Sequence, residues 1–232
     1  MVLVTGAAGG LGQGIVAEFA AQGWRVAAGW HRGTSQVETA QIWPVQLEVT
    51  SRASVDQAVQ ALLARWSRVD VLINNAGLTA DHLVGQMPEE DWDRVLAVNL
   101  KGAFLCSQAV PRTMIKQRDG QIINLSSFGA RSGPKGQANY AAAKAGLLGL
   151  TQSLAREVGS RNVRVNAVLP GVLPTPMTAA LPTGVMDEFA AANALGRINR
   201  VDEVARFIVF LAAMRNVSGQ LFQLDSRIGR WT

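Results

Sequence analysis

The sequence predicts one α/β domain over residues 1–232, built on a doubly wound parallel sheet of about seven strands with helices on both faces. Short apolar runs alternate with longer stretches of helical periodicity along the whole chain, as in βαβ units. The first apolar run, Met1–Thr5, leads directly into a glycine-rich turn and a helix, the order found at the first crossover of such sheets. Right-handed crossovers then favour the strand order 3-2-1-4-5-6-7.

The composition is that of a globular chain, with 48% hydrophobic residues among 232. No apolar run approaches the roughly 18 residues that a membrane helix needs, and no signal peptide is expected at the N-terminus. The single cysteine, Cys106, can form no internal disulfide, which fits a reducing cytoplasm. The net charge is +5, but the basic residues are scattered rather than clustered, which favours an anionic small ligand or an acidic partner over nucleic acid.

The glycine-rich turn after the first strand is expected to bind the phosphates of a nucleotide. Glycines let the backbone turn tightly and approach a pyrophosphate, which sits at the N-terminus of the following helix. A plain glycine-rich turn is the alternative, but the order of strand, turn and helix favours the nucleotide. The expected contacts are Gly6, Gly9, Gly10, Leu11 and Gly12.

The end of the second expected strand, Arg25–Trp30, predicts the type of cofactor. A free ribose diol usually meets an acidic residue here, whereas a 2′-phosphate is accommodated by Arg. This strand is followed by His31 and Arg32 and by no acidic residue. The guanidinium of Arg32 offers a planar fork suited to phosphate, with His31 as an adjunct. We therefore expect NADP(H), with a solvated basic turn as the alternative.

The third expected strand, Trp43–Leu47, follows a connection from Gly33 to Ile42 that leaves little room for a full helix. Glu48 and Val49 come directly after this strand and are expected to line an adenine pocket. The helix that follows carries a continuous apolar stripe, which we interpret as core rather than as a binding surface.

The fourth expected strand, Val69–Ile73, ends in Asn74-Asn75-Ala76-Gly77. Amide side chains at the carboxyl end of a strand can brace neighbouring strands or contact a ligand, and Ala and Gly let a cofactor come close. We therefore expect Asn75, Ala76 and Gly77 at the binding site.

Tyr140 and Lys144 are candidate catalytic groups, because residues four apart lie on one face of a helix. A lysine cation one turn away would favour the phenolate and lower the tyrosine pKa from its ordinary value of ~10. Tyr140 is then a candidate proton donor. Taken alone the pattern is weak, since a surface tyrosine and lysine on an Ala-rich helix look the same.

Two further polar sites accompany this pair. The fifth expected strand, Gln121–Leu125, delivers Ser126 and Ser127 to the carboxyl edge of the sheet, where a hydroxyl can hydrogen-bond a substrate oxygen. No glycine elbow surrounds these serines, which argues against a nucleophile. Asn99 lies in an otherwise apolar helix, where it needs partners and could hold a kink and a water; structural and catalytic roles both stay open.

The remaining elements complete the sheet: a sixth strand at Arg164–Leu169, a last helix at Val201–Met214 and a last strand at Leu221–Leu224. The sixth strand ends in Pro170 and Gly171. The segment from Val172 to Leu195 is rich in Pro, Ala and Thr and has weak periodicity, which predicts a mobile lid.

Taken together and in order, the glycine turn, Asn-Asn-Ala-Gly, a serine 13 residues before a tyrosine, and Tyr-x-x-x-Lys resemble the short-chain dehydrogenase/reductase family from end to end. The resemblance implies a Rossmann-type fold and a catalytic set of Asn99, Ser127, Tyr140 and Lys144. Ser127 and Tyr140 would bond the substrate carbonyl oxygen, and Tyr140 would give the proton as the nicotinamide delivers hydride. Lys144 would bind the nicotinamide ribose, and Asn99 would hold a water that links Lys144 to solvent.

The resemblance also implies further cofactor contacts. The family's glycine pattern is met by Thr5, Gly6, Gly10 and Gly12, and the positions after Pro170-Gly171 match its contacts to the carboxamide. No metal site is expected. The full set of expected cofactor contacts is Gly6, Gly9, Gly10, Leu11, Gly12, His31, Arg32, Glu48, Val49, Asn75, Ala76, Gly77, Tyr140, Lys144, Pro170, Gly171, Val172 and Thr175.

Within that family the chain most resembles the bacterial β-ketoacyl-acyl-carrier-protein reductases of fatty acid biosynthesis, through Gly136–Leu147 and Ser153–Val158. This implies NADPH-dependent reduction of a β-ketoacyl thioester in the cytoplasm. Arg118 and Arg161 fall where surface arginines of that group dock the acidic carrier protein; solvated charge at helix ends is the alternative.

The apolar faces of the helices near 100–117 and 139–158 look too wide for one sheet contact. The family resemblance implies that these helices pair between subunits, giving a homodimer or homotetramer.

Some positions depart from the family pattern. Glu48 stands where the family usually has Asp or Asn, Asp225-Ser226-Arg227 replaces the usual Asp-Gly-Gly, and the lid carries an unusual number of prolines. These departures leave the substrate open, so another ketone, a sugar or a pterin is an alternative. A non-catalytic nucleotide-binding scaffold is a further alternative, disfavoured by the intact catalytic set.

Overall fold

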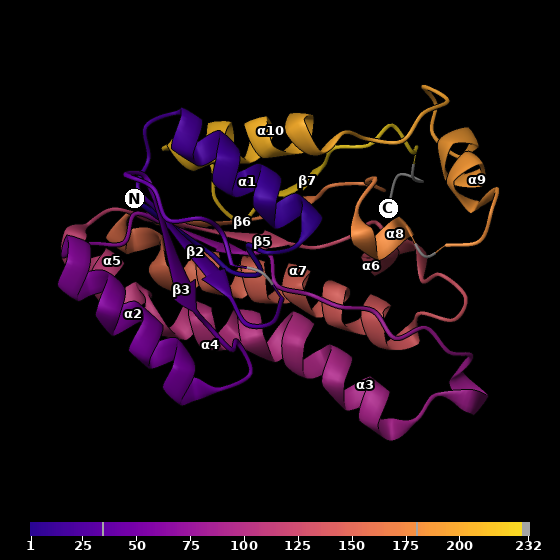
Figure 1. Cartoon of the computed structure of the whole chain (residues 1–232), viewed down its shortest axis with the longest axis horizontal. Coiled ribbons are helices and arrows are strands. Elements are labelled where there is room, and N and C mark those ends of the chain that lie inside the picture. Colours follow the sequence, from indigo (N-terminus) through magenta and orange to yellow (C-terminus); the bar gives the residue numbers. More distant parts are fainter. Residues whose placement is uncertain (34, 180, 229–232) are drawn as a thin grey trace.

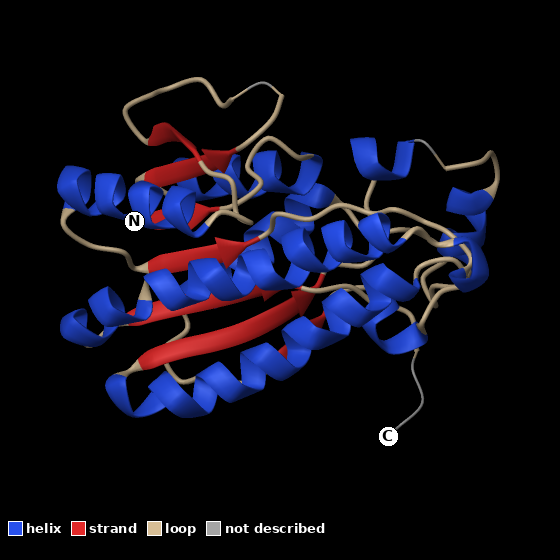
Figure 2. Ribbon diagram, turned by 90° about the horizontal axis from the view of Figure 1, so that it is seen from below, coloured by secondary structure: helices blue, strands red, loops and turns tan. Residues whose placement is uncertain are grey.

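A computed structural model describes residues 1–33, 35–179 and 181–228. One parallel seven-stranded sheet lies between two layers of helices (Figure 1) and its strands run side by side in Figure 2. The strand order β3-β2-β1-β4-β5-β6-β7 confirms the prediction. The strands are β1 Val2–Val4, β2 Val26–Trp30, β3 Ile42–Gln46, β4 Val71–Asn74, β5 Gly120–Leu125, β6 Val163–Leu169 and β7 Leu221–Gln223.

Helices cover both faces of the sheet, as predicted. In Figure 1, α1 and α10 lie above the sheet, and α2, α4 and α7 lie below it. The helices are α1 Gly10–Ala21, α2 Arg52–Trp66, α3 Glu89–Leu96, α4 Gly102–Ala109, α5 Pro111–Gln117, α6 Gly129–Ser132, α7 Ala138–Val158, α8 Pro176–Ala179, α9 Val185–Ala191 and α10 Val201–Ala213.

Alternate residues of each central strand face opposite helix layers. Val4 of β1 packs in the cluster that includes Ile15 of α1 and Ile208 of α10. Its neighbour Leu3 packs in the other cluster, which includes Leu62 of α2. All five side chains are at most 1% exposed. Because the side-chain period of a strand is two, this burial fixes the orientation of each strand and therefore of what leaves its carboxyl end.

The carboxyl ends of all seven strands meet at one edge, because every pair in the sheet is parallel. Loops that leave this edge carry the glycine turn after β1, His31 after β2, Asn75 after β4, Ser127 after β5 and Pro170 after β6. In an open α/β sheet ligands bind in the crevice outside these ends. The topology thus gathers residues that are far apart in the sequence.

The expected lid contains two short helices, α8 and α9, joined to the last helix by turns. Their four and seven residues are too few to give a clear helical period, which is why the sequence predicted a lid of weak periodicity and neither helix. Pro176 occupies the first position of α8, where proline is well tolerated. Residue 180 of this segment is outside the described residues.

None of the helices in the described ranges is long and apolar enough to cross a membrane.

Candidate active site

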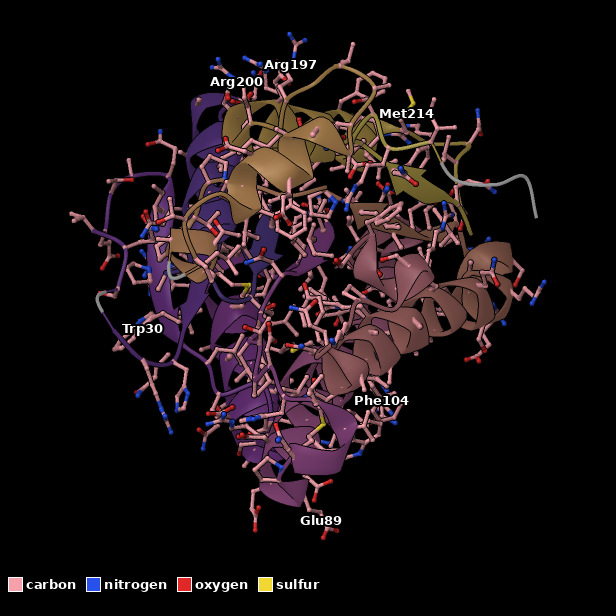
Figure 3. The ribbon with its side chains drawn as sticks, turned by 90° about the vertical axis from the view of Figure 1, so that its right-hand side faces the viewer. Trp30, Glu89, Phe104, Arg197, Arg200 and Met214 are labelled. Carbon is pink, nitrogen blue, oxygen red and sulfur yellow. The ribbon has the colours of Figure 1, made fainter. Side chains whose placement is uncertain are left out.

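A cavity of about 740 Å³ opens at the carboxyl edge of the sheet, between the strand ends and the segment that carries α8 and α9. All eighteen expected cofactor contacts line it, as do Ser127, Tyr140 and Lys144 of the expected catalytic set. Figure 3 looks at this end of the molecule, with Trp30 of β2 at one side, Glu89 of α3 at the bottom and Arg197 at the top. The sequence therefore predicted one connected site.

The glycine turn packs so closely on β4 that side chains are excluded. Gly6 has a φ of 64°, and a Cβ placed on it would lie 2.7 Å from the Cα of Ala76. A Cβ on Gly12 would lie 2.2 Å from the carbonyl oxygen of Gly6. The amide of Asn75 donates to the carbonyls of Thr5 and Gly6, each at 3.1 Å. The bare backbone at the start of α1 therefore fits the pyrophosphate of a dinucleotide.

Tyr140 and Lys144 share one face of α7, as predicted. The Lys144 ammonium lies 5.6 Å from the centre of the Tyr140 ring and donates to the carbonyl of Leu125 at 2.8 Å. Lys144 is 5% exposed, whereas Tyr140 is half-buried. Ser127 begins the loop after β5, and its hydroxyl accepts the backbone N–H of Gly129 at 3.1 Å. The three side chains converge on the same wall of the cavity.

The structure gives a pKa shift for Tyr140 opposite to the one expected from Lys144. Burial raises the pKa of the phenol, the hydrogen bond with Ser127 lowers it by less, and the Asp81 carboxylate adds to the rise. The expected lowering is wrong for this structure, because burial of the phenol is the largest effect on its pKa. Burial also lowers the pKa of Lys144 from 10.5 to about 8. Tyr140 is therefore held protonated at neutral pH, which is the form that a proton donor requires.

Asn99 shapes the site without lining the cavity. It lies in a π-helical turn, Ala97–Lys101, between α3 and α4, which agrees with the expected kink. Its side-chain oxygen accepts the N–H of Leu78 and its amide donates to the carbonyl of Leu78, both at 2.8 Å. A Cβ on Gly77 would lie 3.0 Å from that oxygen and 3.5 Å from the Lys144 ammonium. Asn99 thus fixes the loop after β4 beside Lys144; its expected water stays a prediction.

The basic turn after β2 contains an ion pair that the sequence did not predict. His31 Nδ1 lies 2.6 Å from Glu48 Oε2, across the ends of β2 and β3. The other Glu48 oxygen accepts the backbone N–H and the hydroxyl of Thr50, at 3.0 and 2.8 Å. Burial works against ionisation of Glu48, but these bonds and the charges of His31 and Arg32 hold its pKa below the ordinary value. Arg32 itself is exposed at the rim of the cavity.

Several residues of the cavity wall were not predicted. Asp81, Arg94 and Gln137 lie at its mouth, where Gln137 donates to Asp81 at 2.7 Å. Arg94 looks in sequence like any solvated arginine of α3, and no local pattern distinguishes it. The expected lid contributes apolar side chains to the same cavity: Met177, Leu181 and Phe189.

Comparison with known proteins gives the family. A family model described as short chain dehydrogenase matches residues 1–185. The chain belongs to the short-chain dehydrogenase family. It is 43% identical to the 3-oxoacyl-(acyl-carrier-protein) reductase FabG of Thermotoga maritima, over 96% of this chain and 95% of the relative. It is 40% identical to a 3-oxoacyl-(acyl-carrier-protein) reductase of Synechocystis, over 97% and 95%.

A third relative, the FabG of Staphylococcus epidermidis, is 37% identical over 96% of both chains. Membership in the short-chain dehydrogenase family makes this protein an oxidoreductase that uses a nicotinamide cofactor. The glycine turn around Gly6 and Gly12, here called the glycine cradle, and the cavity beside Tyr140 have the shape that such a cofactor requires.

The burial of Lys144 predicts how stability depends on pH. Its folded-state pKa of about 8 lies below the ordinary 10.5, so between these values the unfolded state binds more protons and stability rises with pH. Relative to Lys144→Met, which cannot titrate, the parent should gain on the order of 2 to 3 kcal/mol of unfolding free energy from pH 7 to pH 10. Urea unfolding at the two pH values measures this gain.

The exposed Lys135 provides the control, since Lys135→Met should differ from the parent by a constant amount at both pH values. A constant difference between parent and Lys144→Met would show that burial does not shift the Lys144 titration.

Proposed function

We propose that the protein reduces the ketone of a β-ketoacyl thioester to the β-hydroxyacyl thioester at the expense of NADPH. The observation that carries the proposal is the convergence of Ser127, Tyr140 and Lys144 on one wall of a cavity that also contains the glycine cradle. The names of the relatives support the substrate class, because each is a reductase of 3-oxoacyl groups on acyl carrier protein. The cytoplasm is the compartment that we propose, since the one cysteine can form no internal disulfide.

Each catalytic side chain has a distinct part in the proposed reaction. The hydroxyls of Ser127 and Tyr140 hold the ketone oxygen, and Tyr140 passes its proton to that oxygen as the carbon is reduced. The nicotinamide, when bound, supplies the hydride, so hydride and proton together convert the ketone to an alcohol. The Lys144 ammonium keeps two N–H groups beyond its bond to Leu125, and these hold the ribose next to Tyr140. The proton that Tyr140 loses returns from solvent.

The apolar side of the cavity suits an acyl thioester. Met177, Leu181 and Phe189 line the same cavity as the catalytic side chains, so they can cover the carbons that flank the ketone. Excluding water there strengthens the hydrogen bonds from Ser127 and Tyr140 to the ketone oxygen. Other small ketones, sugars and pterins are the competing substrates, and the rate of NADPH consumption with each of them, compared with acetoacetyl-CoA, separates these alternatives.

NADPH is the proposed form of the cofactor. Arg32 is exposed at the rim of the cavity beyond the end of β2, where a 2′-phosphate on the adenine ribose would lie. His31 lies beside it and is paired with Glu48, so the carboxylate is turned to the imidazole rather than left to repel the phosphate.

Arg118 and Arg161 lie far from the cavity of their own chain. Each stands two residues before a strand, β5 or β6, and therefore at the amino edge of the parallel sheet, opposite Tyr140. Both are exposed, and the amide of Asn162 donates to the carbonyl of Arg118 at 2.8 Å, which joins the two loops. We propose that a carrier protein docked on these arginines serves the cavity of a second copy of the chain.

The exposed Phe104 on α4 lies on the helix layer through which a dimer or tetramer would form, and it is 42% accessible in one chain. Light scattering that finds only monomer at micromolar concentration would contradict this assembly.

The first test uses Tyr140→Phe, which keeps the ring and removes the proton donor. Turnover of NADPH with acetoacetyl-CoA should fall by about 10²- to 10⁴-fold, whereas the Kd for NADPH should stay nearly unchanged. Tyr140 is the only tyrosine in the sequence, so no other phenol can replace it. Turnover within a few-fold of the parent would reject the mechanism.

Arg32→Asp tests the choice of cofactor. The preference for NADPH over NADH, measured as the ratio of Kd values, should fall by about 10- to 100-fold, because a charge-assisted bond is lost and a like charge is introduced. Arg25→Asp is the matched control at the opposite end of the same strand, and it should leave the ratio unchanged. An unchanged ratio in Arg32→Asp would remove Arg32 from the phosphate site.

Exchanging both Arg118 and Arg161 for Glu tests carrier docking. The KM for acetoacetyl thioester on the carrier protein should rise at least about tenfold at low salt, with the KM for acetoacetyl-CoA unchanged. Arg197→Glu, which alters an exposed arginine between α9 and α10 at the carboxyl end of the sheet, is the control. Equal KM values for parent and double variant on the carrier-linked substrate would place docking on another surface.

A further inference from the structure

The chain after β7 forms a buried ionic contact in place of the expected glycines. The side chain of Asp225 is 2% exposed and that of Arg227 is 13% exposed. Arg227 Nε donates to Asp225 Oδ2 at 2.6 Å, and the other carboxylate oxygen accepts the amide of Gln223 at 2.7 Å. That amide also donates to the carbonyl of Arg227 at 2.8 Å. Both oxygens of Asp225 are therefore bonded, and the guanidinium is held in one orientation.

The held guanidinium covers an aromatic ring beside the catalytic serine. Arg227 Cζ lies 3.8 Å from the centre of the Phe128 ring, and Phe128 directly follows Ser127. A second link joins the same elements, because Arg131 of α6 donates to the side-chain oxygen of Gln223 at 3.3 Å. The start and the end of the Ser127–Ser132 stretch are thus both attached to the C-terminal segment. An arginine held by a carboxylate and stacked on a ring fixes direction as well as distance.

The residue between the two charges joins this contact to the lid. The backbone N–H of Ser226 donates to the side-chain oxygen of Asn193 at 3.0 Å. In return, the carbonyl of Ser226 accepts the N–H of Ala194 at 3.1 Å, and its hydroxyl accepts the N–H of Leu195 at 3.2 Å. These bonds fix the chain that leaves α9. Figure 1 shows α6, α8 and α9 at one end of the molecule.

We propose that Arg227, oriented by Asp225, is a positioning residue for the reaction: it holds Phe128, and through it the Ser127 hydroxyl, in place against Tyr140. The effect of Arg227 on turnover rests on the proposed reductase function, whereas its effect on the Ser127–Ser132 stretch does not. The burial of the pair favours this role over stability alone, because a buried ion pair contributes little net stability compared with apolar residues of similar size. Arg227 acts on Ser127 through its direct contact with Phe128, the next residue in the chain.

A displaced Ser127 has a defined chemical consequence. The Ser127 hydrogen bond lowers the pKa of Tyr140 against the opposing effect of burial. Loosening Phe128 should weaken that bond and also the bond to the substrate oxygen. Turnover should then fall, and the alkaline limb of the pH profile of kcat should move to higher pH, whereas NADPH binding should not change.

Three variants test the proposal: Arg227→Met, Phe128→Leu and the two combined. Backbone amide exchange of residues 126–132 should be faster in each than in the parent. The kcat with acetoacetyl-CoA should fall by about 10- to 100-fold in each single variant, with the Kd for NADPH unchanged. Because Arg227 acts through Phe128, the double variant should be no worse than the worse single variant. Phe128→Leu leaves the Asp225–Arg227 pair intact and carries the test alone if Arg227→Met does not fold.

Arg200→Met is the matched control. Arg200 and Asp202 also form an arginine–aspartate pair two residues apart, with Nε to Oδ1 at 3.0 Å, but on an exposed surface. Figure 3 shows Arg200 at the outer surface of the molecule. Its loss should change neither the exchange of residues 126–132 nor kcat.

Unchanged exchange of residues 126–132 in Phe128→Leu and in Arg227→Met would overturn the proposal, as would additive losses of kcat in the double variant. The variants could exchange residues 126–132 faster than the parent while the parent itself reduces no carbonyl compound. That result would support the contact between Arg227 and Phe128 and reject the proposed function, so the two failures are distinguishable.

Discussion

The site depends on the hydrogen bond from the buried Lys144 ammonium to the carbonyl of Leu125. This bond ties α7, which carries Tyr140, to the last residue of β5, directly before the loop that carries Ser127. The ammonium loses most of its hydration in this position, which lowers its pKa, and it keeps its remaining N–H groups for a ligand. This contact therefore sets the distance between α7, which carries Tyr140, and the loop that carries Ser127. It also holds the Lys144 ammonium in the buried position that lowers its pKa.

The parallel sheet supplies the rest of the site by geometry. Each strand delivers the residue after its carboxyl end to the same edge, so residues from Gly6 to Phe189 line one cavity. The close approach of Gly6 and Gly12 to neighbouring backbone leaves polar N–H groups open at the start of α1. The segment with α8 and α9 then closes the cavity on its apolar side. Binding and chemistry are thus consequences of strand order and of a few small residues.

The strand order could be predicted, and the residues expected to contact the cofactor all line one cavity, because apolar runs, glycines and the Tyr140–Lys144 spacing are local signals. Their contact with a cofactor stays a prediction. Three features could not be predicted. The pairing of Glu48 with His31 depends on the register of β2 and β3, which the sequence does not state. The helices α8 and α9 are too short to show a period. The rise in the Tyr140 pKa depends on burial, which outweighs the lowering by the Ser127 hydrogen bond, and the spacing of Tyr140 and Lys144 does not show how deeply the phenol is buried.

The most direct test of the account is the product of a single reaction. Purified parent protein is mixed with NADPH and acetoacetyl-CoA, and both the loss of NADPH absorbance and the thioester formed are measured. We expect one 3-hydroxybutyryl-CoA for each NADPH consumed, with faster turnover when the acyl group is on carrier protein. Consumption of NADPH with a different ketone but not with the thioester would contradict the proposed substrate, and no consumption with any carbonyl compound would contradict the mechanism.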